Sequence, residues 1–168
     1  AQIDPADLRK GISYVPQDIH LFGGTIKQNI LGIHKFIDDE WMLECSKMRG
    51  TDEFVRMHPA GYDMPLGERG AGLSGGQRQS VGISRALINN SDIWMFDEPT
   101  NAMDQTSESI VLNNLMSKIE GKTLLLVTQK MSMVDLVDRI IVMNFGSKVL
   151  DGPKDEIINK LGNSGETQ

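Results

Sequence analysis

Apolar residues in this chain form short blocks, and their spacing alternates between strand-like and helix-like along the sequence. Three apolar or β-branched runs predict strands: Ile12–Val15, which we expect to end at Gln17, then Ile93–Phe96 and Thr123–Thr128. The last two runs carry almost no polar positions inside them, which is typical of strands covered on both faces.

Segments with helical spacing and capping residues lie between and after these strands. The predicted helices cover residues 25–30, 38–48, 51–57, 77–88, 104–120, 133–137 and 155–161, and a hairpin joins residues 139–144 to 148–150. The stripes expected to face the core are Trp41, Cys45 and Met48; Phe54 and Met57; Val81, Leu87 and Ile88; and Val111, Leu115 and Ile119. This alternation predicts an α/β fold with a mainly parallel sheet and a small helical lobe inserted over residues 38–60.

Polar residues follow the predicted strands directly. Gln17, Asp97 and Gln129 each come just after one of them. Since the ligands of such sheets lie beyond the carboxyl ends of the strands, we expect these three residues to share one site.

Composition narrows the classes of function. The chain of 168 residues is 39% hydrophobic and 24% charged, which is ordinary for a soluble domain with a core. Its net charge of −6 disfavours a nucleic-acid surface, which would normally be basic. Cys45 is the single cysteine, so no internal disulfide can form. No apolar run is long enough to span a membrane.

Two motifs carry candidate chemistry. Asp97 and Glu98 follow a buried run, where one carboxylate can hold Mg²⁺ and the other can orient or deprotonate a water. Taken alone, the pair also fits a solvated acidic turn. Ser74–Gln77 opens a helix after a glycine-rich segment, and free N–H groups at a helix start suit phosphate. Together the motifs favour a site for a nucleoside triphosphate.

The order of Gln17, Leu73–Gln79, Asp97–Thr100, Asp104 and Gln129 resembles the nucleotide-binding domain of ATP-binding cassette (ABC) transporters over nearly the whole chain. The resemblance implies a P-loop NTPase-like (RecA-like) fold with an inserted helical subdomain. It further implies a partial ABC ATPase domain over residues 1–168, with a helical or signature subdomain at about 31–90. Core parts are expected at 11–30 and 91–161, and a frayed tail at 162–168.

The resemblance also implies roles for single residues. Asp97 is expected to hold Mg²⁺ with Gln17, which is also a catalytic candidate because its amide can orient water. Glu98 is the expected catalytic base, and Gln129 takes the catalytic place of the usual switch histidine. Ser74, Gly75, Gly76 and Gln77 form the signature segment (Ser74–Gln77), which contacts ATP held by the opposite subunit. Asp104 ends the D-loop (Asn101–Asp104) at the seam of a head-to-tail homodimer.

Further details resemble the exporter branch. Leu21–Ile30 looks like the segment that meets the coupling helices of a transmembrane domain, and Gly67–Gly70 looks like the exporter cross-contact loop. Gly61–Asp63, the D-loop and Asp151–Glu156 resemble type I secretion ATPases, which export toxins and adhesins. The implied location is the cytoplasmic face of a bacterial inner membrane, reached only through the transmembrane domain.

The sequence departs from the family at two points. No Gly-x-x-x-x-Gly-Lys-Ser/Thr phosphate loop occurs in it. We therefore interpret the chain as a fragment without the P-loop strand and the N-terminal β-subdomain, and expect it alone to bind ATP poorly and not hydrolyse it. We also expect a gap, an exposed apolar seam or rearranged pairing between the strand before Gln129 and the strand at Arg139. Gln129 cannot become cationic as histidine can, so slow hydrolysis is expected in the full protein.

Two other functions fit parts of the pattern. A non-hydrolytic regulatory or dimerisation module would be consistent with Gln129, although Glu98 is present. A soluble ABC-type ATPase acting on DNA usually carries a long coiled coil between the residues that match Gln17 and Ser74. The segment here is too short for one, and the acidic charge disfavours DNA.

Overall fold

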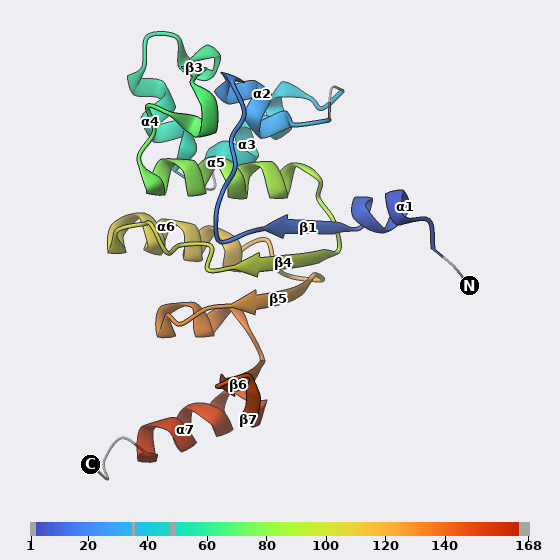
Figure 1. Ribbon diagram of the computed structural model, residues 1–168, viewed down its shortest axis with the longest axis vertical. Helices are drawn as coiled ribbons and strands as arrows, with labels where there is room; N and C mark the ends of the chain where they lie inside the picture. The colour runs from blue at the N-terminus through green and yellow to red at the C-terminus, as the bar shows by residue number, and fades with distance from the viewer. Residues whose placement is uncertain (1–2, 35, 48–49, 165–168) are drawn as a thin grey trace. The chain divides into compact units, whose positions relative to one another are not determined.

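The computed structural model describes residues 3–34, 36–47 and 50–164. They fall into two compact units, Ala1–Gln129 and Lys130–Gln168, which are described separately (Figure 1). The first unit contains helices α1 (Pro5–Lys10), α2 (Ile26–Leu31), α3 (Asp39–Lys47), α4 (Thr51–Met57), α5 (Gly75–Ile88) and α6 (Gln105–Met116), 3-10 turns η1 (Gly61–Asp63) and η2 (Glu68–Gly70), and strands β1 (Ile12–Val15), β2 (Gly24–Thr25), β3 (Pro65–Leu66), β4 (Ile93–Asp97) and β5 (Thr123–Val127). The second contains η3 (Met131–Leu136), β6 (Arg139–Asn144), β7 (Ser147–Pro153) and α7 (Lys154–Ser164).

The predicted parallel sheet is present in the first unit. Strands pair in the order β1-β4-β5, and Val15, Phe96 and Leu126 are opposite one another in register. All three strands therefore end at the same edge, as the sequence predicted. β1 stops at Val15 rather than Gln17, because Pro16 has no N–H to donate to a neighbouring strand.

Only one face of this sheet is well buried. Val15, Trp94 and Phe96 are at most 2% exposed, and the Trp94 and Phe96 rings stack 5.7 Å apart. On the opposite face Tyr14, Leu125 and Val127 are each more than half exposed. The prediction that the strands at 93–96 and 123–128 are covered on both faces is therefore wrong for this unit. Among the described strands, β5 pairs with β4 alone.

Helix α5 is the central packing element. It contacts α2, α3 and α4 and also β1, so it lies between the helical lobe and the sheet (Figure 1). Val81, Leu87 and Ile88, which were predicted as its buried side, are at most 3% exposed. The same helix thus closes the lobe and covers the sheet.

The lobe differs from the prediction in which face of α4 is buried. Thr51 and Val55 are fully buried, whereas Met57 is 84% exposed. The Thr51 hydroxyl lies 3.1 Å from that of Ser84 on α5, so the buried face of this short helix carries Thr51 and Val55 rather than Met57. Cys45 is buried as predicted, while Met48 lies outside the described residues.

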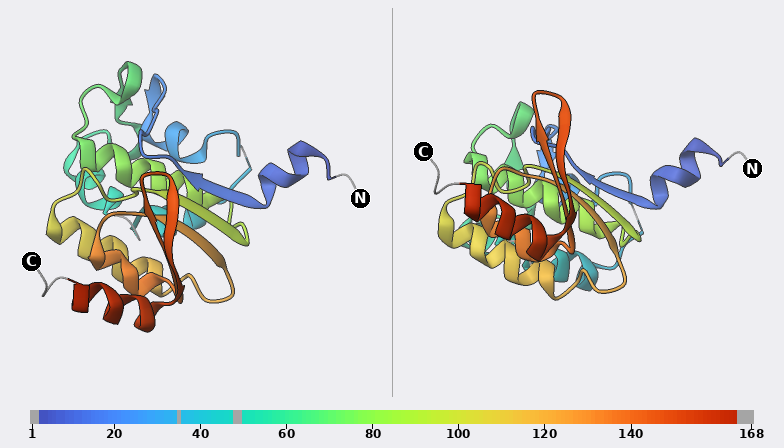
Figure 2. Two further views of the ribbon diagram at one scale, coloured as in Figure 1. Left: turned by 60° about the horizontal axis from the view of Figure 1, so that its bottom comes forward. Right: turned by 90° about the horizontal axis from the view of Figure 1, so that it is seen from below.

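Some elements were not predicted. α1 has no buried residue and extends away from the start of β1 in both figures (Figures 1 and 2). The two-residue strands β2 and β3 pair antiparallel and are too short to leave an apolar pattern. In contrast, the helix at Thr25 is confirmed by its capping box with Gln28.

The second unit is a hairpin followed by a helix (Figure 2). β6 pairs antiparallel with β7 through a Phe145–Gly146 turn, where both residues have positive φ. α7 packs against β7 and continues to Ser164, so residues 162–164 are helical rather than part of a frayed tail. None of the described helices has both the length and the apolar character that crossing a bilayer requires.

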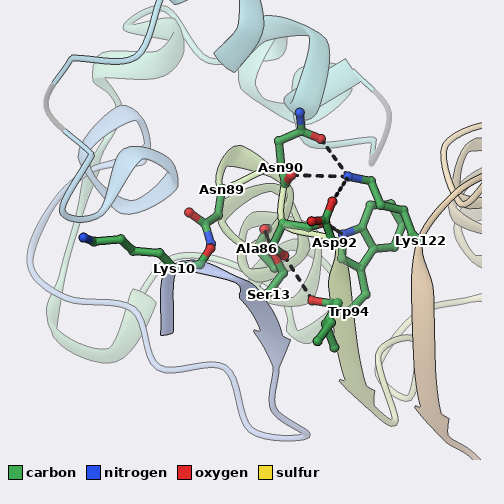
Figure 3. A network of polar contacts seen from close by, with 10 residues as sticks. Lys10, Ser13, Ala86, Asn89, Asn90, Asp92, Trp94 and Lys122 are labelled. Carbon is green, nitrogen blue, oxygen red and sulfur yellow. Dashed lines mark hydrogen bonds and ion pairs between the residues drawn. The ribbon is translucent and has the colours of Figure 1, made fainter. Parts of the chain in front are cut away.

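Buried polar groups join α5 to the sheet at the other end of the strands (Figure 3). The Ser13 hydroxyl donates to the carbonyl of Ala86, and the Ser91 hydroxyl lies 2.6 Å from that of Ser13. The Trp94 indole donates to the Ser91 carbonyl at 3.1 Å. On the surface, Lys122 donates to the carbonyl of Asn90 at 3.3 Å. These contacts fix the loop that links α5 to β4.

Replacing Ser13 tests this network. Ser13→Ala removes the buried hydroxyl that donates to the Ala86 carbonyl and contacts the Ser91 hydroxyl, so the free energy of unfolding should fall by about 1–3 kcal/mol in urea titrations. Ser109→Ala is the control, because the Ser109 hydroxyl is exposed on α6. Its effect should stay within about 0.5 kcal/mol. Equal losses in both variants would contradict the structural role of Ser13.

Candidate functional site

The tip of β4 presents two adjacent carboxylates. Asp97 is the last residue of the strand and pairs in register with Val127. Within the described part of the chain its carboxylate has no hydrogen bond or ion pair. Glu98 begins the turn that follows, and both side chains are half-buried. The predicted carboxylate pair therefore lies at the carboxyl edge of the sheet.

Glu98 is held in an unusual backbone conformation. Its φ is +44°, in the left-handed region that costs a non-glycine residue about 1–2 kcal/mol. Its N–H donates to the Val127 carbonyl at 2.9 Å. Its carboxylate accepts the backbone N–H of Gln129 at 3.0 Å and the Thr128 hydroxyl at 3.4 Å. The chain leaving β5 thus orients the carboxylate.

Glu98 and Gln129 are therefore brought together, but through the backbone of Gln129. The Gln129 side chain is exposed and makes no hydrogen bond within the described residues. Gln17 is also exposed, two residues beyond the end of β1. Since β1 is the hydrogen-bonded neighbour of β4, Gln17 follows the same sheet edge as Asp97. Within the described residues, no hydrogen bond joins Gln17 to Asp97 or Glu98.

The signature segment forms the capped start of α5. The Ser74 hydroxyl accepts the Gln77 N–H at 3.1 Å, and the Gln77 side chain accepts the Ser74 N–H at 2.9 Å. This capping box leaves the N–H groups of Gly75 and Gly76 without a partner in the described part of the chain. Two free donors at the positive end of a 14-residue helix suit an anionic group.

The two glycines are also needed for packing. A Cβ on Gly75 would lie 3.0 Å from the Cβ of Ala102, and one on Gly76 would lie 3.1 Å from the Ala102 carbonyl oxygen. The start of α5 therefore packs directly on the D-loop. Sequence reasoning assigned the glycines to ligand approach and missed this contact.

A pocket of ≈ 350 Å³ adjoins this helix start. It is lined by Gly50, Glu53, Phe54, Met57, Ser74, Gly75, Gly76, Gln77, Ser80, Ala102, Asp104, Ser107 and Ile110. Asp104 caps α6 by accepting the N–H and hydroxyl of Ser107, both at 2.9 Å. These hydrogen bonds lower the pKa of Asp104. The signature segment and the D-loop thus share one concave surface.

Comparisons with known proteins agree with this geometry. The sequence model described as ABC transporter matches residues 1–101. The chain belongs to the ABC transporter family. A solved structure titled as a bacterial Atm1-family ABC exporter with ATP bound superposes with a TM-score of 0.87 and 30% identity, over 92% of this chain and 27% of that one. The α/β, P-loop NTPase-like fold class is thereby confirmed.

Curated relatives are similar over most of the chain. The leukotoxin translocation ATP-binding proteins LktB of a Pasteurella haemolytica-like species (strain 5943B) and of Mannheimia glucosida are each 40% identical over 158 residues. The match covers 94% of this chain and 22% of each relative. The chain therefore spans about a fifth of the length of these ABC proteins.

The carboxylates at the end of β4 suit Mg²⁺ better than a metal that needs several protein ligands. Within the described residues, no cluster of three or more His, Cys, Asp or Glu side chains is arranged to hold a metal. Mg²⁺ does not need such a cluster, because it is commonly held by one or two carboxylates together with phosphates and water. The Asp97 carboxylate, at the edge of the sheet, is a donor of the type that such a site uses.

Two buried or half-buried polar residues of α5 were missed as candidates. Gln79 is 5% exposed and bonds to the turn after β4, at Glu98 and Ala102. Arg85 donates to the backbone carbonyls of Asn29 and His20 at 2.6 and 3.0 Å. The available signal was position: Gln79 falls on the buried row of α5 that also contains Ile83 and Leu87.

The contact between α5 and the D-loop can be tested at Gly76. Helix propensity favours alanine over glycine by about 1 kcal/mol. Overpacking against the Ala102 backbone should outweigh that gain, so Gly76→Ala should lower the free energy of unfolding by about 1 kcal/mol net. Gly11→Ala is the control, because its Cβ would meet its nearest atom at an ordinary 3.6 Å. A stabilised Gly76→Ala variant in urea titrations would contradict the contact.

Proposed function

We propose that this chain is part of the ATP-hydrolysing domain of an ABC exporter that drives type I secretion of a protein such as a toxin or adhesin. The observation that carries the proposal is the Glu98 carboxylate, which accepts the Gln129 N–H beside the unpaired Asp97 at the carboxyl edge of the sheet. The 40% identity to leukotoxin translocation proteins supports the exporter class and its cargo.

In this proposal each residue has one role. Glu98 orients and deprotonates the water that attacks the γ-phosphate of ATP. Asp97, with Gln17, would hold Mg²⁺, which neutralises charge on the phosphates. The fixed backbone around Glu98 keeps the base in place, and the exposed amide of Gln129 is free to donate to a phosphate oxygen.

We infer that two copies act together as a head-to-tail homodimer. Asp97 and Glu98 would serve the ATP of their own subunit, while Ser74–Gln77 and Asp104 would face the nucleotide and surface of the partner. The free N–H groups of Gly75 and Gly76 support this role for the signature segment, because they suit a phosphate. The phosphate loop would come from outside these 168 residues, and the chain by itself would be inactive.

A transmembrane domain is the second proposed partner. Within Leu21–Ile30, the Phe22 side chain is 46% exposed, while Ile26 and Ile30 are fully buried. Beyond it, Ile33 is 88% and Phe36 100% exposed. Exposed apolar side chains next to an anchored helix suit docking by coupling helices. The ATPase domain would then lie on the cytoplasmic face of the bacterial inner membrane and make no contact with nucleic acid.

Hydrolysis by the complete transporter tests the role of Glu98. Glu98→Gln should lower the steady-state ATPase rate by about 100-fold or more, because the base is lost while the hydrogen-bonding shape is kept. ATP binding, measured by equilibrium titration, should persist. Glu120→Gln is the control, since Glu120 is exposed after α6, and its rate should match wild type. A fully active Glu98→Gln protein would refute the proposal.

Gln129 tests the alternative of a regulatory module. Because Gln129 holds Glu98 through its backbone N–H, substitution leaves that bond intact and isolates the side chain. Gln129→His should raise the ATPase rate by about tenfold if the missing imidazole limits the reaction. Gln129→Ala should be no faster than wild type. Equal rates in all three proteins would show that this side chain does not set the rate, and no hydrolysis in any would favour the regulatory module.

A further inference from the structure

The Gln79 side chain joins the signature helix to the turn that carries the base. Its Nε2 donates to the backbone carbonyl of Glu98 at 3.3 Å, and its Oε1 accepts the N–H of Ala102 at 2.8 Å. The orientation of the amide follows from these partners, since a carbonyl needs a donor and an N–H needs an acceptor. One planar group thus spans both ends of the turn between β4 and the D-loop.

Burial makes these hydrogen bonds costly to lose. Gln79 is 5% exposed, so its amide has little water to replace the protein partners. Just above it, Gly75 and Gly76 pack on Ala102 with no room for a Cβ. Backbone packing and a buried amide therefore hold the helix start and the D-loop together.

The strained backbone of Glu98 depends on such constraints. A left-handed conformation persists in a residue with a side chain only when its surroundings over-determine it. The Val127 carbonyl accepts the Glu98 N–H, and the Gln129 N–H donates to the Glu98 carboxylate. The Glu98 carbonyl accepts the Asn101 N–H at 3.2 Å within the turn and the Gln79 amide at 3.3 Å from α5. Two constraints thus come from β5 and the chain that leaves it, one comes from the turn itself, and α5 contributes the Gln79 amide.

We propose that Gln79 is a positioning residue that couples the signature segment to the Glu98 base and the D-loop of the same subunit. The inference rests on the proposed function. In a head-to-tail dimer the signature segment closes on the partner's ATP, while Glu98 acts on the ATP of its own subunit. A shift of α5 at one site therefore moves the base at the other site through Gln79. This residue links the two hydrolysis events.

The experiment uses the complete transporter with Gln79→Met, which keeps the length of the side chain and removes its amide. The kcat for ATP hydrolysis should fall about tenfold, because the Glu98 base is less well positioned. The Hill coefficient should fall toward 1, because the two ATP sites of the dimer are no longer coupled. Affinity for MgATP should change less than about twofold, because the Gln79 amide is buried and bonds to the backbone of Glu98 and Ala102. Gln79→Glu keeps the acceptor for Ala102 but turns a buried carboxylate oxygen toward the Glu98 carbonyl oxygen, so its kcat should fall at least as far as that of Gln79→Met.

Ser84→Ala is the matched control for loss of a buried polar group from α5. Its hydroxyl bonds to the Ser80 carbonyl and to Thr51 within the helical lobe, away from the base. Hydrogen exchange of peptides covering residues 98–102 gives a readout independent of catalysis. Protection there should fall in Gln79→Met and persist in Ser84→Ala.

The outcomes separate the inference from the function on which it rests. If wild type hydrolyses ATP while Gln79→Met matches Ser84→Ala in kcat and Hill coefficient, the coupling role is wrong and the proposed function stands. Unchanged protection of residues 98–102 in Gln79→Met would overturn the coupling role whatever the rates. A wild type without ATPase activity would overturn both.

Discussion

Parallel hydrogen bonding between β1, β4 and β5 is the constraint on which the site depends. Parallel strands end at the same edge of a sheet, so the chain leaves this edge at Gln17, Asp97 and Gln129. Only the register that places Phe96 opposite Leu126 lets the carboxylate of Glu98 accept the N–H of Gln129. A slip of one residue would turn the side chains to the other face and break this contact.

Helix α5 connects this edge of the sheet to the D-loop and to β1. Its start offers free N–H groups, its middle places Gln79 under the turn after β4, and its end bonds through the Ala86 carbonyl to β1. Its start, middle and end thus contact different parts of the unit. The glycines at its start let two backbones approach within van der Waals distance, which larger residues would prevent.

Elements with strong local signals were predictable. The continuous run of β4, the helix start at Ser74–Gln77 and the buried stripe of α5 all appear in the structure as expected. Elements without such signals were not. α1 buries no residue, and β2 and β3 are two residues long. Apolar composition also misled at β5, because a run of leucines reports a preference for burial and not whether another segment supplies the cover.

The sequence by itself determined the fold class, the family and the order of the functional residues, because periodicity and motifs are local properties of the chain. Tertiary structure decided how those residues are held. The bond from Gln79 to Glu98 spans 19 positions and that from Gln129 to Glu98 spans 31. Such contacts depend on strand register and on the approach of α5 to the turn. No local pattern encodes them, since each requires two distant segments to meet at hydrogen-bonding distance.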